Sequence, residues 1–217
     1  MILALETAAY NAAYVALYGD GLADQRAIEE PRAAAAQVLP AVRSLCAEHG
    51  VNGHDLAALA VDCGPGSFTG IRIGIATALG LQAGWAVHTA AVSQFDLYFA
   101  YLPPGAALVL LDARSRGLLY YEYRGPGIDP QRGVVKPDEL PGLWTGLPVP
   151  PACVAGNVVI DAALLDGRTV QQRTVVDALA VACEAERRLA SGTVDEALVP
   201  VYLHTSLVRP PNPPQSL

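Results

Sequence analysis

A run of thirteen residues, Asp-Cys-Gly-Pro-Gly-Ser-Phe-Thr-Gly-Ile-Arg-Ile-Gly at 62–74, most constrains how this chain folds. An apolar segment at 56–62 precedes it and predicts a buried strand, and helical spacing follows from 68 to about 83. A strand that passes through glycines into a helix is a building unit of α/β proteins, in which the helix packs back on the sheet. The segment therefore predicts an α/β fold with a tight turn at 64–70.

This loop differs from the glycine motifs of common catalytic and nucleotide-binding sites. A Walker A loop needs Gly-Lys-Ser/Thr, but no lysine lies nearby, and the Rossmann pattern has Thr69 in place of its third glycine. A nucleophile elbow would need glycines where Pro65 and Thr69 stand. Two interpretations remain. Either Ser67 caps a structural turn, which we favour, or the free N–H groups at the helix start bind an anion.

Small residues recur every four positions inside the predicted helix, at Gly70, Gly74 and Ala78, with Gly80 nearby. An interior glycine costs about 1 kcal/mol of helix stability relative to alanine, so this spacing needs a compensating contact. A helix side without side chains lets another backbone approach closely. That backbone belongs either to the protein's own sheet or to a partner helix docked on the surface, and the spacing alone favours neither.

The whole chain predicts two successive units that each begin with a strand pair and then add helices. Expected strands cover residues 2–8, 11–18, 22–29, 56–62, 86–90, 107–113, 118–123, 153–160 and 199–203. Expected helices cover a region around 38–46 that contains Pro40, then 68–83, 93–101 and 174–191, the last opened by Thr174 and Asp177. Residues 125–151 are rich in Gly and Pro and predict no helix. Pro103-Pro104-Gly105 marks the boundary between subdomains 1–104 and 105–208, and an extended Pro-rich tail follows at 209–217.

Glu6 and Thr7 close the first strand and precede a hairpin, where actin-like ATPases and sugar kinases hold metal and phosphate. The matching place in the second half is Asp112-Ala113-Arg114, which lacks the glycines that let a backbone approach a phosphate closely. No lysine is placed to reach a β- or γ-phosphate. The pattern therefore favours a degenerate phosphate site over an intact ATPase.

Composition argues against several classes of function. Fourteen basic residues, all arginine except Lys136, stand against 21 acidic ones, for a formal net charge of −7. We expect the isolated chain to bind nucleic acid weakly, because such binding rests on phosphate neutralisation. The four cysteines lie far apart and the four histidines form no ligand-spaced pair, which predicts a reducing compartment and no metal site. We also expect a cytoplasmic protein without membrane contact, because the uncharged stretch 73–95 contains polar breaks.

Four segments carry a resemblance to one family. They are Ile-Leu-Ala-Leu-Glu-Thr at 2–7, the glycine segment at 64–74, Leu-Asp-Ala-Arg at 111–114 and Pro-Val-Tyr-Leu at 200–203, in this order. Together they resemble the TsaB family, also called YeaZ, the bacterial partner in threonylcarbamoyl-adenosine modification of tRNA. The resemblance spans nearly the whole chain, and segment 64–74 is its most specific part. The sequence departs from the family pattern at Glu6, usually aspartate, at the alanines 33–36, usually a His-Ser pair, and at His204, usually arginine.

The resemblance implies two actin-like (ASKHA, ribonuclease H-like) subdomains, each a mixed sheet flanked by helices, and a role without catalysis. It implies a heterodimer with the transferase TsaD, which the ATPase TsaE joins, and contact with tRNA only through that complex. It implies no tightly bound cofactor, while a nucleotide at the partner junction and a homodimer in the absence of the partner are compatible with it. The docking surface would be the first two helices, about 33–49 and 68–83, and Gly74→Leu should disrupt the complex.

Two sets of candidate residues follow. The partner-interface candidates are Val38, Leu39, Val42, Phe68, Gly70, Ile71, Gly74, Thr77, Ala78 and Leu81. The candidates for a degenerate phosphate site are Glu6, Thr7, Gly64, Gly66 and Ser67. The alternative function from another class is a self-sufficient actin-like ATPase or small-molecule kinase that uses Glu6 and the loop 64–70. Binding of Mg-ATP by the isolated protein separates the two functions.

Overall fold

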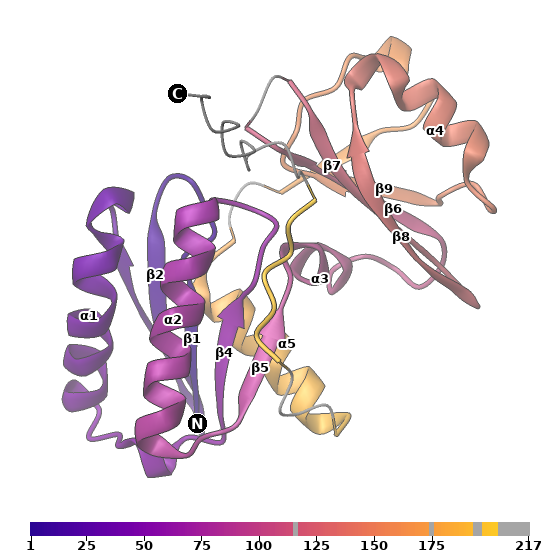
Figure 1. Cartoon of the computed structure of the whole chain (residues 1–217). Helices are drawn as coiled ribbons and strands as arrows, with labels where there is room; N and C mark the ends of the chain where they lie inside the picture. Colours follow the sequence, from indigo (N-terminus) through magenta and orange to yellow (C-terminus); the bar gives the residue numbers. More distant parts are fainter. Residues whose placement is uncertain (115–116, 174–175, 193–196, 204–217) are drawn as a thin grey trace, which may run out of the picture.

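Two five-stranded sheets form the framework of the computed structural model, which describes residues 1–114, 117–173, 176–192 and 197–203 (Figure 1). The first sheet has the order β3-β2-β1-β4-β5 and consists of Ile2–Glu6 (β1), Ala13–Gly19 (β2), Leu22–Ile28 (β3), Ala58–Asp62 (β4) and Thr89–Val92 (β5). The second has the order β10-β9-β6-β7-β8 and consists of Ala107–Asp112 (β6), Leu119–Gly125 (β7), Ile128–Val135 (β8), Cys153–Gly156 (β9) and Val170–Gln172 (β10).

Strand pairing follows the same pattern in both sheets. β1 pairs antiparallel with β2 and parallel with β4, and β6 likewise pairs antiparallel with β7 and parallel with β9. In the first sheet Leu5 lies opposite both Val15 and Val61. Numbered within its own half, each sheet has the order 3-2-1-4-5. The prediction of a duplicated α/β unit is therefore confirmed at the level of topology.

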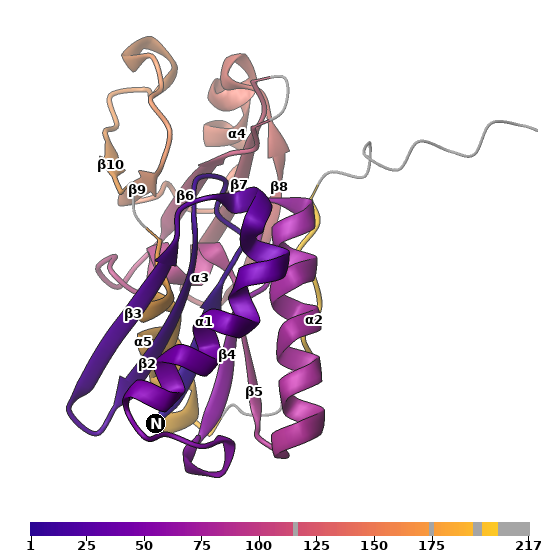
Figure 2. The same cartoon turned by 90° about the vertical axis from the view of Figure 1, so that its left-hand side faces the viewer.

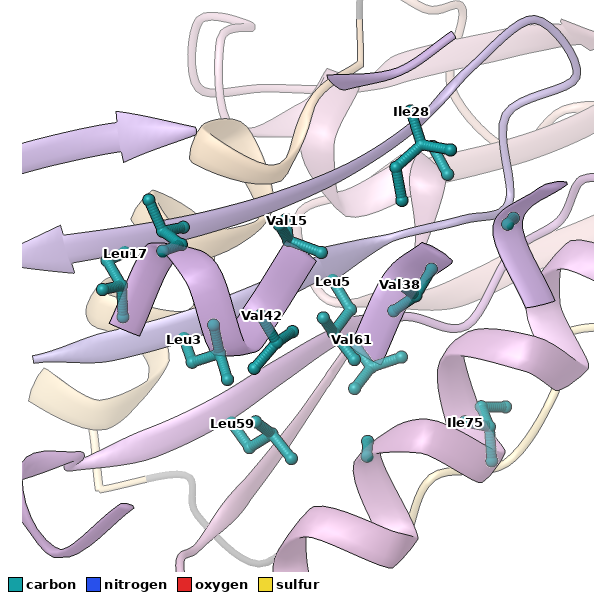
Figure 3. Packing of buried hydrophobic residues seen from close by; sticks show 14 of the residues in the cluster. Leu3, Leu5, Val15, Leu17, Ile28, Val38, Val42, Leu59, Val61 and Ile75 are labelled. Atoms are coloured by element: carbon teal, nitrogen blue, oxygen red, sulfur yellow. The ribbon is translucent and has the colours of Figure 1, made fainter. Parts of the chain in front are cut away.

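Two long helices cover one face of the first sheet and lie side by side there (Figures 1 and 2). The α-helices of the described chain are Ala34–Glu48 (α1), Phe68–Trp85 (α2), Gln94–Phe99 (α3), Leu140–Gly146 (α4) and Ala178–Ala190 (α5). Because side chains alternate along a strand, Leu3 and Leu5 of β1 point to the same face and pack in one cluster with Val38 of α1 and Ile75 of α2 (Figure 3). Full burial of such an aliphatic side chain contributes about 1.5–3 kcal/mol.

The opposite face of the first sheet is built from small residues and is covered by α5. Ala4 and Ala60 lie in one cluster with Ala178 and Ala182 of this helix. Small side chains on both surfaces let the helix and the sheet approach closely, as dense protein packing requires. Asp177 caps α5 through a hydrogen bond that its carboxylate accepts from the backbone. The central strands are thus buried on both faces.

The two halves exchange their last helices. α3 follows β5 in the chain but packs on the second sheet, where Phe95 and Tyr98 cluster with Val109 and Tyr120. α5 follows β10 but packs on the first sheet. The predicted division into 1–104 and 105–208 is wrong for these two helices, because position in the sequence does not show which sheet a helix covers.

A network of charged residues joins the exchanged helices to the second sheet. Asp96 of α3 forms ion pairs with Arg188 of α5 at 2.6 Å and with Arg124 of β7 at 2.5 Å. Arg124 also pairs with the buried Glu122 at 2.6 Å, and Arg188 with the buried Glu184 at 3.1 Å. Burial opposes ionisation of Asp96, but the two guanidinium groups hold the pKa of this carboxyl below its usual value.

The second half contains two elements in the stretch where the sequence predicts no helix. β8 is an edge strand, the position in a sheet that tolerates a proline such as Pro130. α4 has Pro141 in its first turn, where the missing N–H has no helical acceptor to lose. Both prolines therefore stand at positions where a strand or a helix tolerates proline. The Gly and Pro content of this stretch alone does not reveal β8 and α4.

Two strand predictions also need correction. α2 continues to Trp85 and ends at Ala86, whose φ of 52° is left-handed, so β5 begins at Thr89 and not at 86. The expected strand at 199–203 is wrong, because residues 197–203 form an irregular strap in which Val201 N donates a hydrogen bond to Cys63 O at 2.8 Å. Thr174, His204 and the tail 209–217 lie outside the described residues.

None of the helices in the described ranges combines the length and the apolar character that crossing a bilayer requires.

Candidate functional site

The loop 64–70 connects β4 to α2, and Ser67 forms the N-cap of this helix. Ser67 Oγ accepts a hydrogen bond from Gly70 N at 3.1 Å. This bond satisfies one of the N–H groups that have no partner at a helix start. The structural interpretation of Ser67 is therefore confirmed.

The glycines of this segment let α2 lie directly against the end of β1. A Cβ atom on Gly70 would lie 1.9 Å from Thr7 O, and one on Gly74 would lie 2.4 Å from Thr7 Oγ1. A Cβ atom on Gly66 would lie 2.3 Å from Ala8 O. Thr7 Oγ1 also donates a hydrogen bond to Gly70 O at 2.8 Å. Of the two packings that the spacing allows, contact with the protein's own sheet is confirmed for Gly70 and Gly74.

The five phosphate-site candidates meet at the carboxyl ends of β1 and β4, where three of the backbone donors are already used. Gly64 N donates to Asp62 Oδ1 at 2.7 Å, and Ala9 N donates to Glu6 Oε1 at 2.8 Å. Ser67 N donates to Ala8 O, in the turn between β1 and β2, at 2.7 Å. A phosphate cradle needs several free N–H groups that point to one place. Here two carboxylates and a carbonyl oxygen already accept from three of these groups.

Glu6 and Asp62 form a buried acid pair below this loop. Both side chains are fully buried, and Glu6 Oε2 and Asp62 Oδ2 have no donor in the described chain. Burial and then the charge of Asp62 raise the pKa of Glu6 well above its usual value, and burial raises the pKa of Asp62 to about 7. Two acids in such a place hold a shared proton. They also make the site unfavourable for a phosphate or any other anion.

A cleft of about 270 Å³ lies where the two halves meet. Residues of both halves line it, among them Tyr10, Asn11, Gln94, Tyr98, Asp112, Arg114 and Asn157. The place that the sequence matches with Glu6 therefore lies on the wall that the second half contributes. There Asp112 pairs with Arg114 at 3.2 Å and donates its N–H to Asn157 Oδ1 at 2.8 Å. No group of three or more metal-ligating side chains occurs in the described part of the chain.

Most of the partner-interface candidates lie in the core of the first half. Val38, Val42, Ile71 and Ala78 are at most 1% exposed, and Gly70 and Gly74 are buried too. Because these six residues pack between the helices and the sheet, their assignment to a surface contact is wrong. Phe68, Thr77 and Leu81 are partly exposed, and Leu39 is 47% exposed. These four remain as surface candidates.

Leu39 and nine further exposed residues lie on the solvent-facing side of α1 and α2 that we call the outer face. It consists of Ala35, Ala36, Leu39, Pro40 and Arg43 of α1 and of Arg72, Ala76, Leu79, Gly80 and Ala83 of α2, all exposed. The sequence signal that finds it is Arg72, because a charged residue in an otherwise apolar helix must face water. Steps of three or four residues from Arg72 then give the rest of this side of α2.

Gly80 differs from the buried glycines of α2. A Cβ atom on Gly80 would meet nothing within 4 Å, and the same holds for Gly84 in the last turn. No contact within the described chain therefore explains why this helix carries glycine at either position.

Two mixed sheets of the same order, with exchanged helices and a cleft between them, define an actin-like (ASKHA, ribonuclease H-like) protein. The solved structure of YeaZ from Pseudomonas aeruginosa has this fold, with a TM-score of 0.70 and 25% sequence identity over 93% of this chain and 99% of that chain. The family model described as TsaD, tRNA N6-adenosine threonylcarbamoyltransferase, matches residues 20–149.

The sequence is also 32% identical to the tRNA threonylcarbamoyladenosine biosynthesis protein TsaB of Escherichia coli K12 over 226 aligned residues, which cover 95% of each chain. An uncharacterized protein of Mycobacterium tuberculosis H37Rv is 32% identical over 124 residues, 56% of this chain and 58% of that one. This chain belongs to the TsaB (YeaZ) family.

Proposed function

We propose that this protein is a non-catalytic subunit in the formation of threonylcarbamoyl-adenosine beside the anticodon of tRNA. The observation that carries the proposal is the identity of 32% with E. coli TsaB over 95% of both chains. In this role the protein works in the cytoplasm, binds and activates the transferase TsaD, and forms an assembly that the ATPase TsaE joins.

The outer face supports docking on TsaD. It presents alanine, leucine, proline and glycine on two adjacent helices, and contiguous exposed apolar surface is typical of protein contacts. Gly80 costs the helix about 1 kcal/mol relative to alanine, and a partner helix packed against this position explains the cost. The same surface would support a homodimer when TsaD is absent.

The hydrogen bonds and charges at the carboxyl ends of β1 and β4 support a role without catalysis. The N–H groups of Gly64 and Ala9 already bind carboxylates of the chain, and the buried pair of Glu6 and Asp62 disfavours an added anion. The net charge of −7 also disfavours direct binding of tRNA. We therefore assign the chemistry to TsaD, the contact with tRNA to the complex, and any bound nucleotide to the junction between the subunits.

Gly80→Leu tests the docking surface. The added side chain has open space around it, so the variant should fold and bind TsaD at least about 100-fold more weakly in calorimetry. Gly142→Leu is the matched control, because Gly142 is also an exposed helical glycine with nothing within 4 Å but lies in α4 of the second half. Gly74→Leu cannot serve, because its side chain would collide with Thr7 inside the protein. Equal binding by wild type and Gly80→Leu would contradict docking through this face.

Calorimetry of the isolated protein with Mg-ATP tests the absence of catalysis. We expect neither binding at micromolar concentration nor turnover, because the N–H groups of Gly64 and Ala9 are bonded within the chain and the buried acid pair disfavours an anion. Binding with turnover that Glu6→Ala abolishes would show instead that the protein is a self-sufficient ATPase or kinase.

A further inference from the structure

Three side chains form a cluster at the end of the outer face where α2 begins. The guanidinium carbon of Arg72 lies 3.8 Å from the ring centroid of Phe68, one helical turn earlier. Arg72 Nε donates a hydrogen bond to Tyr202 Oη at 3.1 Å, and the rings of Tyr202 and Phe68 are 5.1 Å apart between centroids. The guanidinium group is thus held from two sides although the residue is exposed.

Tyr202 comes from the strap 197–203, which is itself fixed to the first half. Val201 N donates to Cys63 O at 2.8 Å, and Leu198 and Val201 pack against the core of this half. The strap therefore holds Tyr202 beside α2. Ordering a guanidinium group before binding lowers the entropy that a later contact costs, so Arg72 is prepared for a ligand.

No anion of the described chain uses this prepared group. Arg72 forms no ion pair there, and its two terminal amino groups have no acceptor. α2 contains no acidic residue, and the one in α1, Glu48, is bound by Arg26. Arg43 and Arg72 are therefore the charged residues of the outer face, on a protein with a net charge of −7.

We propose that Arg72 binds a carboxylate of the protein that docks on the outer face, and that this ion pair sets the register of the two helical surfaces. The inference rests on the proposed function, in which TsaD is the docked protein. A planar guanidinium group binds a carboxylate through two parallel hydrogen bonds, and Nη1 and Nη2 of Arg72 are available for them. The partner surface is thus helical, rich in small residues and acidic opposite Arg72.

The same charges disfavour a second copy of the chain as occupant. In a twofold dimer the outer face meets a second copy of itself, and among the ten residues that define this face none is a carboxylate that could pair with Arg43 or Arg72. Like charges across an interface lower affinity. We therefore expect the face to select an acidic partner over itself.

Calorimetric titration of the full chain with TsaD of the same organism tests the assignment. Arg72→Gln should raise Kd about 10-fold or more at low ionic strength and should flatten the dependence of Kd on salt. Arg72→Lys should fall between wild type and Arg72→Gln, because it keeps the charge and loses the planar fork. Lys136→Gln, which removes an exposed charge from the second half, should bind like wild type. Thermal unfolding confirms that each variant is folded.

The outcomes separate this inference from the proposed function. Failure of the wild type to bind TsaD overturns both. If the wild type binds, Gly80→Leu does not, and Arg72→Gln binds within about 2-fold of wild type at every salt concentration, the role of Arg72 is wrong while docking stands. A larger effect of Arg72→Gln on self-association, measured by sedimentation, than on binding to TsaD also overturns the role of Arg72.

Discussion

The two halves have the same strand order but very different helical layers. In the first half α1 and α2 place 15 and 18 residues across the sheet. The corresponding connections of the second half contain a 3-10 turn at Pro137–Glu139 followed by α4, with 7 residues, and then a 3-10 turn at Ala162–Leu164. The sheet order therefore sets the topology of each half, while the length of the helical connections sets the surface that the half can present. The half with the long helices carries the outer face.

Close backbone contact persists in both halves but serves different elements. In the first half Gly70 lets α2 touch the end of β1, where a Cβ atom would lie 1.9 Å from Thr7 O. In the second half Gly156 lies in β9, and a Cβ atom there would be 2.0 Å from Leu110 O of the neighbouring strand β6. A glycine thus allows a helix to approach a strand end closely in the first half, and allows two neighbouring strands to approach closely in the second half.

The largest effect should come from Gly70→Ala. Its methyl group would overlap a backbone oxygen that cannot move aside, so we expect a loss of about 3–5 kcal/mol in the free energy of unfolding, measured in urea. The variant should also lose the outer face and with it binding to TsaD. Gly156→Ala should lose comparable stability but retain binding while it is folded, and wild-type stability of Gly70→Ala would show that α2 is not seated by this contact.

Asp96→Ala should have the next largest effect, because it leaves two arginines of the network between the halves without their shared carboxylate. Loss of one partner from a mostly buried ion pair costs about 3 kcal/mol. We expect this loss in urea unfolding, together with unfolding of the two halves at different urea concentrations. Asp166→Asn removes an exposed ion pair with Arg168 and keeps a side chain that tolerates the left-handed backbone at this position, so it should cost less than about 1 kcal/mol. A single transition at wild-type position for Asp96→Ala would show that the network does not couple the halves.

The acid pair of the first half predicts an unusual dependence of stability on pH. The pKa of Asp62 is about 7 in the folded protein and 3.8 in its usual state, so the folded chain keeps a proton that the unfolded chain releases between these values. For this pair the contribution to stability should be greatest below pH 4 and should decrease as the pH rises toward 7.

Glu6→Gln and Asp62→Asn should each flatten this profile in urea titrations at several pH values. Asp112→Asn, at the equivalent strand end of the second half, is the matched control, because its carboxylate pairs with Arg114 at the surface and contributes about 1 kcal/mol or less. A wild-type protein whose stability rises steadily from pH 4 to 7 would contradict the shared proton.

The smallest effect should be a gain of stability from Gly80→Ala. Alanine removes the helix cost of glycine and meets no neighbour, so unfolding should require about 1 kcal/mol more. Gly142→Ala in the short α4 should give a gain of the same sign. Calorimetry with TsaD should show weaker binding for Gly80→Ala and unchanged binding for Gly142→Ala. Equal affinities of the two variants would mean that no helix packs against Gly80.

Local chemistry explains which parts of the structure could be predicted from the sequence. The presence of strands β1 and β2, the cap at Ser67 and the strand–loop–helix unit depend on neighbouring residues, and these predictions are confirmed. The exchange of α3 and α5 depends on contacts between residues far apart in the chain, which periodicity does not contain.

The interface candidates show the same limit within one helix. Gly70, Gly74 and Ala78 mark a close contact correctly, but the spacing does not say whether the neighbour is internal. The phosphate-site candidates are brought together, yet the hydrogen bonds that use their donors depend on the fold.

The exchange of helices has a consequence for synthesis on the ribosome. The alanine-lined side of the first sheet is complete once β5 has been made, but its cover, Ala178–Ala190, is translated almost ninety residues later. During this interval, at about 5–20 residues per second, the nascent chain exposes an apolar surface for several seconds. Truncation before residue 178 therefore leaves a first half that exposes its sheet, and chaperones should bind such fragments more strongly than the finished protein.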